Sequence, residues 1–268
     1  MGMKAFFRWL GLVVMACVAL QLFFLGRVAL MAVVDPQSTA FQRSEAWRLV
    51  TDGPASPRPN AKNTPPPAGS LRWAQTWVPY GQIADGLKRA VIASEDGGFV
   101  NHEGVDWEAL DKAWQKNEKA EAQAAKTIAA SKPAAAPNLR SAARAPKIFG
   151  GSTITQQLAK NLLLSGERTL LRKGQEFVLA LMLELVLDKQ RILEIYLNSV
   201  EWGEGIFGAE AAAQHYFRKP AARLSAYEGA RLAVMLPRPK YFERVPNSGY
   251  LSHRATVIVG RTADVELP

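Results

Sequence analysis

The chain has few of the residues that build disulfides or metal centres. Its 268 residues include one cysteine, Cys17, and three histidines. A single cysteine excludes an intramolecular disulfide, and so few ligands disfavour a structural zinc site, which uses four. The spacing Gly-x-x-x-x-Gly-Lys-Ser/Thr is absent, which excludes a P-loop. No segment alternates apolar and polar residues strongly enough to predict a strand, so the expected fold is mainly α.

The chain also has fewer acidic residues than basic ones. Lys and Arg number 33 against 24 Asp and Glu, which gives a formal net charge of +9. Such a charge indicates an anionic partner: nucleic acid, anionic lipid or a phosphorylated substrate. Nucleic acid is disfavoured, because the basic residues lie largely in low-complexity segments without an aromatic stacking platform.

One long apolar run lies near the N-terminus. Residues 9–26 contain no charged side chain, and about 18 such residues are enough for a membrane-spanning helix. Lys4 and Arg8 precede the run, which favours a cytoplasmic N-terminus. A cleaved signal peptide is the alternative, although the run is long for one. We expect a cytoplasmic tail at 1–8, an uncleaved anchor at 9–34, and the rest of the chain outside the cytoplasm.

Two segments are too poor in large apolar residues to build a core. Residues 35–70 predict a Pro-rich tether. Residues 119–147 are mostly Ala, Lys and Pro and predict a flexible, exposed insertion that holds an Ala-rich helix to Ala130. The remaining sequence predicts one domain over 71–260 and a tail at 261–268.

Helical spacing is clear within that domain. An almost continuously apolar stretch at 177–187 is too short to span a bilayer and predicts a buried core helix. Three glycines predict a loop at 201–208. Apolar spacing predicts further helices over 83–94, 192–197, 209–217 and 225–236.

The segment from Gly150 to Asn161 is the clearest candidate binding site. Thr153 and Gln156 have the spacing of a capping box that starts a helix. Gln157 and Lys160 then lie on the face of Thr153. Free N–H groups at a helix start favour an anion, so this face suits a phosphate-bearing ligand. The alternative is a Gly-Ser turn into an ordinary amphipathic helix.

Carboxylates form two further candidates. Glu95 ends the predicted helix at 83–94, where the helix dipole tends to raise the pKa of a carboxyl group and so favours an acid or base role. The alternative is a solvated acidic loop with Asp96 and His102. Arg172 and Glu176 are four residues apart and point the same way on a helix, which is also the spacing of a simple surface ion pair.

Taken in order, five motifs resemble the glycosyltransferase family 51 peptidoglycan polymerases, and within them the monofunctional biosynthetic transglycosylases. The resemblance covers about residues 71–250. The motifs are 95–99 with His102, Gly104 and Asp106, then 150–161, 172–176, 192–198 and 232–237.

The resemblance implies a lysozyme-like, mainly α domain with a small membrane-facing jaw lobe. It implies lipid II as substrate, polymerised into β-1,4 glycan strands by inverting transfer with release of undecaprenyl pyrophosphate. Glu95 would be the general base, and Glu176 the second essential carboxylate, near the donor pyrophosphate or its metal. The segment 192–198 would give structural support, and its polar residues could brace the cleft. The implied substrate-binding residues are Asp96, Phe99, His102, Thr153, Gln157, Lys160, Asn161, Arg172 and Lys173.

The resemblance also implies a cofactor, a location and partners. Mg²⁺ or Mn²⁺ is a candidate cofactor with Glu176 as its ligand, and no organic cofactor is expected. The location would be the bacterial inner membrane, single-pass, with a periplasmic catalytic domain. Lipid II, the growing glycan strand and the bilayer would be partners, with penicillin-binding and division proteins as candidates. The leucines at 162–164, near Leu170 and Leu171, could dip into the membrane or pack in the core.

Other functions are disfavoured. A lysozyme-like lytic enzyme shares fold and glycan, but it has no pyrophosphate to hold at Lys160 and Arg172. An inactive wall-synthesis scaffold needs neither Glu95 nor Glu176. Neither Ser-x-x-Lys nor Lys-Thr-Gly occurs in the chain, so no penicillin-binding transpeptidase activity is expected from it.

Overall fold

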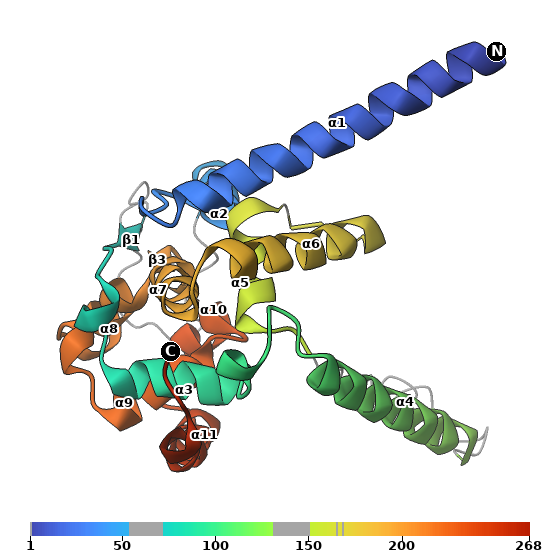
Figure 1. Ribbon diagram of the computed structural model, residues 1–268. Helices are drawn as coiled ribbons and strands as arrows, with labels where there is room; N and C mark the ends of the chain where they lie inside the picture. Colours follow the sequence, from blue (N-terminus) through green and yellow to red (C-terminus); the bar gives the residue numbers. More distant parts are fainter. Residues whose placement is uncertain (1, 54–71, 131–150, 165, 168) are drawn as a thin grey trace.

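The computed structural model describes residues 2–53, 72–130, 151–164, 166–167 and 169–268. The Pro-rich part of the predicted tether (54–71) and the second part of the predicted insertion (131–147) lie outside the described residues. The described chain is mainly helical, as expected (Figure 1).

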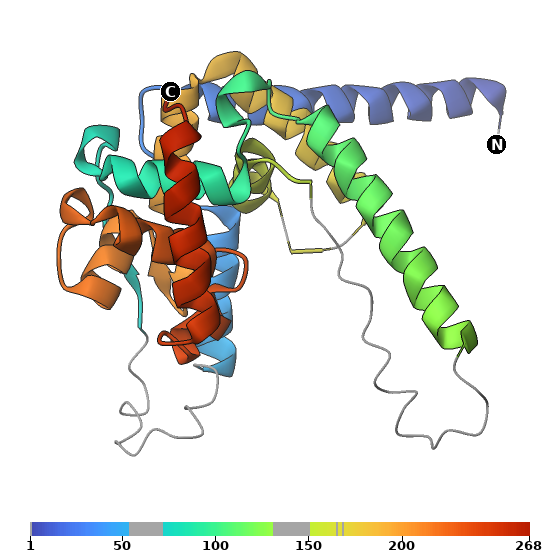
Figure 2. The same ribbon diagram turned by 90° about the horizontal axis from the view of Figure 1, so that it is seen from below.

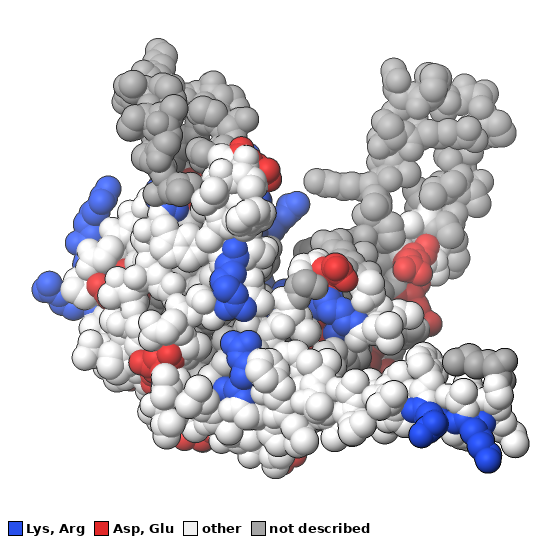
Figure 3. Space-filling model, turned by 90° about the horizontal axis from the view of Figure 1, so that it is seen from above, with Lys and Arg blue, Asp and Glu red and all other residues white. Residues whose placement is uncertain are grey.

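Helix α1 (Met3–Leu30) extends away from the rest of the chain in both ribbon views (Figures 1 and 2). Its most apolar window has a mean hydropathy of 2.2, and none of that window is buried by other parts of the chain. A core helix would bury this surface, so length, composition and exposure together fit a membrane-crossing helix. Figure 3 shows basic side chains near its free end and an uncharged stretch between that end and the body.

The C-terminal half of α1 meets α6 (Leu170–Val186). The side-chain amides of Gln21 and Gln175 exchange two hydrogen bonds, of 2.9 and 3.1 Å. Val28 is fully buried. The anchor is therefore packed against the domain where it leaves the apolar stretch.

Helix α2 (Ala40–Asp52) lies where the tether was predicted, so that prediction is wrong for these residues. Thr39 and Gln42 form a capping box at its start. Gln42, Glu45 and Leu49 are buried against the body. The polar composition of this segment predicted that it is exposed to solvent. The helix instead buries polar and charged side chains, because their partners come from distant parts of the chain.

The body is built from packed helices. Helix α3 (Asp85–Glu95) packs along α9 (Ala226–Met235), and α9 packs against α11 (Gly249–Arg261). A Cβ atom on Gly229 would lie 2.8 Å from the backbone of Leu87, so glycine is required where α3 and α9 cross. Helix α5 (Ile154–Leu163) packs against both α6 and α7 (Lys189–Ser199).

These helices confirm the predictions at 83–94, 192–197 and 225–236. The predicted helix at 209–217 is α8 (Ala209–Phe217). The remaining helical elements are α10 (Pro239–Arg244) and the short 3-10 helices η1 (Tyr80–Gln82), η2 (Phe99–Asn101), η3 (Ala221–Arg223) and η4 (Thr262–Asp264).

Residues 201–207 form strands rather than the predicted loop. Strand β3 (Ile206–Phe207) pairs in parallel with β1 (Ala74–Gln75) and antiparallel with β2 (Glu201–Gly203). Strands of two or three residues are too short to show alternation in a sequence. Gly205 turns the chain at a φ of 70°, and any Cβ there would collide with Arg72.

The predicted core helix at 177–187 falls within α6 and is buried on one side only. Leu179 and Leu183 are fully buried, but Leu181 is 52 % and Leu185 80 % exposed. Helix α6 therefore carries a second apolar face toward solvent. The sequence left open whether the leucines at 162–164, 170 and 171 pack in the core or dip into the membrane. Leu162 packs in the core, whereas Leu170 and Leu171 are exposed.

Helix α4 (Trp107–Ala130) includes the predicted Ala-rich helix and extends from the body (Figure 2). Asp106 caps its start, since Asp106 Oδ1 accepts a hydrogen bond of 2.8 Å from the backbone N–H of Ala109. At the other end of the domain, the predicted tail is packed rather than free. The backbone carbonyl of Val265 accepts a hydrogen bond from Arg89 of α3.

Candidate active site

Glu95 is the last residue of α3 and lies in a small pocket of about 120 Å³. Its Oε2 accepts a hydrogen bond of 3.1 Å from Gln157 Nε2 of α5. Burial raises the pKa of Glu95, the neighbouring Asp96 raises it further, and hydrogen bonds from Gln157 and Ser94 oppose the change. A carboxyl group in this setting binds a proton more readily than a solvated one, which suits a general base.

Asp96 joins the Glu95 loop to the start of α5. It is 7 % exposed, and its carboxylate accepts hydrogen bonds from His102 Nε2 (2.9 and 3.1 Å) and from the backbone N–H of Ile154 (2.9 Å). The helix N-terminus that we expected to hold a ligand phosphate is therefore occupied by Asp96. A carboxylate from 58 residues earlier in the chain thus satisfies one of the free N–H groups, and the Thr153 hydroxyl satisfies that of Gln156, so the expected phosphate contact at this helix start gains no support.

Two other predicted substrate contacts are buried. Thr153 is 2 % exposed, and its hydroxyl accepts from Gln156 N and donates to the carbonyl of Gly104 at 2.6 Å. This confirms the capping box. Phe99 is fully buried, with Lys189 Nζ 4.6 Å from its ring centroid. Thr153 lines the smaller pocket of Glu95, and neither Thr153, Phe99 nor His102 lines the larger pocket.

Gln157 is held in one orientation by a residue that we assigned only to a supporting segment. Tyr196 of α7 is 1 % exposed and donates a hydrogen bond of 3.0 Å to Gln157 Oε1. A hydroxyl donor at the amide oxygen turns the amide NH₂ group toward Glu95. Tyr196 therefore positions Gln157, and Gln157 positions the carboxyl group. The predicted bracing role of the 192–198 segment is confirmed at this residue.

The Tyr196→Phe variant is expected to lose about three- to tenfold in kcat, because one hydrogen bond of about 1 kcal/mol no longer fixes the Gln157 amide. Steady-state kinetics measure the loss. Tyr216→Phe is a matched control, since the Tyr216 hydroxyl donates a buried hydrogen bond of 2.7 Å to the Trp202 carbonyl away from both pockets. Equal kcat values for the two variants would contradict a positioning role.

A larger pocket of about 420 Å³ adjoins Gln157. Helix α5 contributes Lys160 and Asn161 to it, and α6 contributes Arg172. Lys160 is exposed as a whole residue, yet desolvation by the surrounding protein lowers its pKa, Glu176 opposes this change, and Arg172 and Lys173 add to it. Lys160 and Arg172 give the pocket two cations that suit an anionic group of a ligand, and Glu167 and Glu201 line the same pocket.

Glu176 organises these cations. It is 3 % exposed, and its two oxygens accept hydrogen bonds from Arg172 Nη1 (2.9 Å) and Lys173 Nζ (2.5 Å). Among the described residues, no three His, Cys, Asp or Glu side chains gather as metal ligands. Because both oxygens of Glu176 already hold cations, the residues here do not fit a protein-bound divalent ion, and the predicted metal role of Glu176 gains no support.

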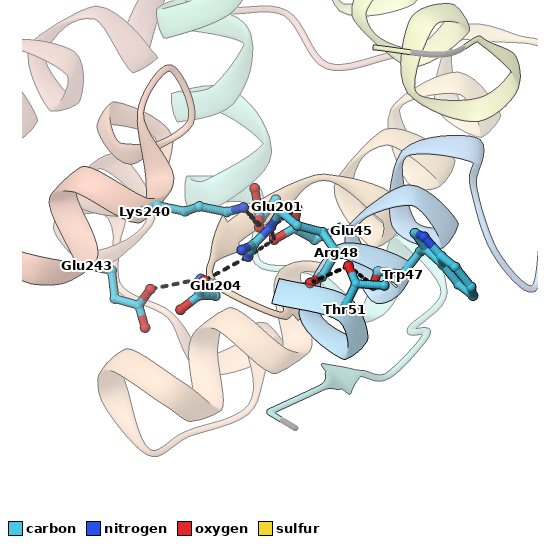
Figure 4. Close-up of polar contacts among 8 residues, drawn as sticks. All are labelled: Glu45, Trp47, Arg48, Thr51, Glu201, Glu204, Lys240 and Glu243. Carbon is cyan, nitrogen blue, oxygen red and sulfur yellow. Dashed lines mark hydrogen bonds and ion pairs between the residues drawn. The ribbon is translucent and has the colours of Figure 1, made fainter. Parts of the chain in front are cut away.

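Helix α2 forms a wall of the larger pocket that the sequence analysis missed. Phe41 and Ser44 of α2 line it, together with Glu201 of β2. The Thr39-x-x-Gln42 spacing of a capping box was the signal that could have revealed this helix. Figure 4 shows how α2 is held: Glu45 and Arg48 meet charged side chains of the β2–β3 hairpin and of α10.

Burial raises the pKa of Glu201 from 4.5 to about 7, Lys240 opposes the change, and Glu45 adds to it. The folded chain thus binds this proton more tightly than the unfolded chain, so the stability contribution is largest below pH 4.5 and is lost as the pH rises to about 7.

We expect Glu201→Gln to be more stable than wild type by about 2–3 kcal/mol at pH 8 and by little at pH 4.5. Thermal unfolding of the detergent-solubilised chain at both pH values measures the difference. A difference that stays constant between the two pH values would contradict the buried, proton-binding state of Glu201.

Fold and site together define a helical enzyme domain that follows an apolar helix long enough to cross a membrane, with a carboxyl group of raised pKa near a pocket lined by Lys160 and Arg172. The transglycosylase family model matches residues 68–131 and 128–263. Biosynthetic peptidoglycan transglycosylases of Burkholderia thailandensis and Burkholderia pseudomallei are 48 % and 49 % identical over 265 residues, covering 97 % of this chain and 88 % of each relative. The biosynthetic peptidoglycan transglycosylase of Paraburkholderia phytofirmans is 44 % identical, and the match covers 94 % of its length. The chain belongs to the transglycosylase family.

Proposed function

We propose that this chain is a peptidoglycan glycosyltransferase that polymerises lipid II, a disaccharide-pentapeptide on undecaprenyl pyrophosphate, into β-1,4 glycan strands. The observation that supports this most is that α5 serves both pockets. It holds Gln157 against Glu95 and presents Lys160 to the cationic pocket. The relatives carry the name of this activity, and their likeness spans nearly the whole chain.

Glu95 would take the proton of the acceptor sugar 4-hydroxyl as that oxygen attacks the donor sugar. The donor bond is α and the new bond is β, so a single inverting displacement fits the change. The raised pKa of Glu95 brings the group closer to neutral pH, where proton transfer to a carboxylate is more favourable. The amide of Gln157 fixes the direction in which the carboxylate faces.

The broken bond leaves its electron pair on the pyrophosphate. Negative charge therefore develops where Lys160 and Arg172 line the larger pocket. Cations preorganised by Glu176 stabilise that charge without needing to reorganise during the reaction. A leaving group of this kind needs no strong general acid.

The location we propose is the bacterial inner membrane, with the domain on the periplasmic side. Lys4 and Arg8 precede the uncharged stretch of α1, which favours a cytoplasmic N-terminus. The exposed leucines at 170, 171, 181 and 185 of α6 give the domain an apolar surface beside the anchor. A lipid-linked donor could reach the pocket along this surface. Cross-linking of the product would then fall to penicillin-binding proteins.

Purified full-length chain incubated with labelled lipid II tests the proposal. We expect lysozyme-sensitive polymer and release of undecaprenyl pyrophosphate. Parallel reactions with Mg²⁺ and with a chelator measure any metal requirement separately. Soluble fragments from purified cell wall, without polymer from lipid II, would favour a lytic enzyme. Bound but unreacted lipid II would favour a scaffold.

A further inference from the structure

Glu201 lines the larger pocket, and one of its carboxylate oxygens has an ion-pair contact but no hydrogen bond among the described residues. Its side chain is 7 % exposed. Its Oε1 is buried and accepts no hydrogen bond from the described residues, although Lys240 Nζ lies 3.4 Å away. A buried acceptor without a hydrogen bond costs about 1–3 kcal/mol. Such atoms are rare in native proteins and call for a specific reason.

The surrounding charges explain why the contact of Glu201 with Lys240 is long. Lys240 Nζ is closer to Glu45 Oε1 than to Glu201 and pairs with it. The same Glu45 oxygen accepts a hydrogen bond of 2.6 Å from Arg48 Nη2, which also contacts Glu204 at 2.7 Å (Figure 4). The two cations of this cluster are thus committed to Glu45 and Glu204. Glu201, which lines the pocket, has only the longer contact with Lys240, and its carboxyl group keeps capacity for a further hydrogen bond.

We propose that Glu201 is a ligand-binding residue of the larger pocket, and that its carboxyl group hydrogen-bonds a hydroxyl or amide group of the lipid-linked glycan donor. This inference rests on the proposed function, because Lys160 and Arg172 of the same pocket would hold the phosphates of that donor. A carboxyl group repels phosphate oxygens when charged, so its partner must come from the neutral glycan or peptide part of the ligand.

The protonation state of Glu201 affects this contact. Burial raises its pKa to about 7, Lys240 and Arg48 oppose this change, and Glu45 adds to it, while Lys160, Glu167 and Arg172 are the other charged residues that line the pocket. Below pH 7 the carboxyl group can donate as well as accept a hydrogen bond. Above pH 7 it places a negative charge in the pocket of an anionic ligand. Binding should therefore weaken as the pH rises through 7.

The test measures the Kd of fluorescent lipid II for the detergent-solubilised full chain, with KM and kcat in parallel. Glu201→Leu should raise Kd and KM about tenfold, the equivalent of one lost hydrogen bond, with kcat little changed. Glu201→Gln keeps a donor and an acceptor and should bind within about threefold of wild type at pH 6.5. Glu204→Gln is the matched control: it weakens the same charge cluster outside the pocket lining and should leave Kd unchanged.

The pH comparison decides the question even if Glu201→Leu fails to fold. Between pH 6 and pH 8.5 the affinity of wild type should fall more than that of Glu201→Gln, because only wild type gains the buried charge. Parallel pH profiles for these two proteins would overturn the inference, as would equal Kd values for Glu201→Leu and Glu204→Gln. Lipid II that binds as expected without being polymerised would overturn the proposed function and leave the role of Glu201 intact. Wild type that fails to bind lipid II would overturn both.

Discussion

Glu95→Gln is expected to abolish polymer formation, with a loss of at least about 10³-fold in kcat. The substitution preserves the shape of the side chain and a hydrogen bond to Gln157, but an amide cannot take the proton of the attacking hydroxyl. The affinity for lipid II should change little. The protein should remain folded, because the variant removes a carboxyl group whose burial already disfavours its charge.

The same residue should govern the acid side of the pH–rate profile. A base must be deprotonated to act, so kcat/KM of wild type should fall as the pH drops toward the raised pKa of Glu95. The matched control is Asp85→Asn at the other end of α3, where an exposed carboxylate pairs with Lys88 at 2.7 Å. This control should keep its activity. If Glu95→Gln formed polymer at the same rate as Asp85→Asn, the assignment of Glu95 as the general base would be wrong.

Glu176→Gln is expected to reduce kcat/KM by about 10²-fold or more and to lower stability by about 2–3 kcal/mol. The carboxylate is 3 % exposed and holds Arg172 and Lys173. Without it, both cations lose their counter-charge and their fixed position. Lys160 also loses the attraction of Glu176, which supports its charged form, so its pKa should fall further. The pocket would then present fewer, less ordered cations to the leaving pyrophosphate.

Glu228→Gln separates stability from chemistry in this experiment. Glu228 pairs with Lys219 at 2.9 Å and closes the capping box of α9, outside the lining of the larger pocket. Thermal unfolding and kcat/KM are measured for both variants. A Glu176→Gln protein that loses stability but retains the kcat/KM of Glu228→Gln would show that Glu176 is only structural.

Much of the fold could be read from neighbouring residues. The capping box of Thr153 and Gln156 and the Arg172–Glu176 ion pair both appear as expected. Each depends on residues three or four positions apart, so the sequence contains the whole interaction. The long uncharged run of α1 is likewise a local property. Helix α2 was the exception, because its capping box was hidden by a polar composition.

The site depended on contacts across the chain. The hydrogen bonds from Tyr196 to Gln157 and from Gln157 to Glu95 span 39 and 62 residues, and Asp96 reaches the start of α5 from 58 residues away. The family resemblance pointed to Gln157 and Glu95 as site residues, but it could not show that Asp96 occupies the helix N-terminus in place of a ligand.

The sequence by itself determined the anchor, the helices, and the residues that carry charge into the site. Periodicity, caps and charge within a few positions decide these features, and no packing is needed to see them. Only the tertiary structure decided that α2 forms a pocket wall, that α6 exposes an apolar face, and that Glu201 is buried with an oxygen that accepts no hydrogen bond from the described residues. Burial and long-range pairing fix these features, because the free energy of a charge or an apolar side chain depends on what surrounds it in space.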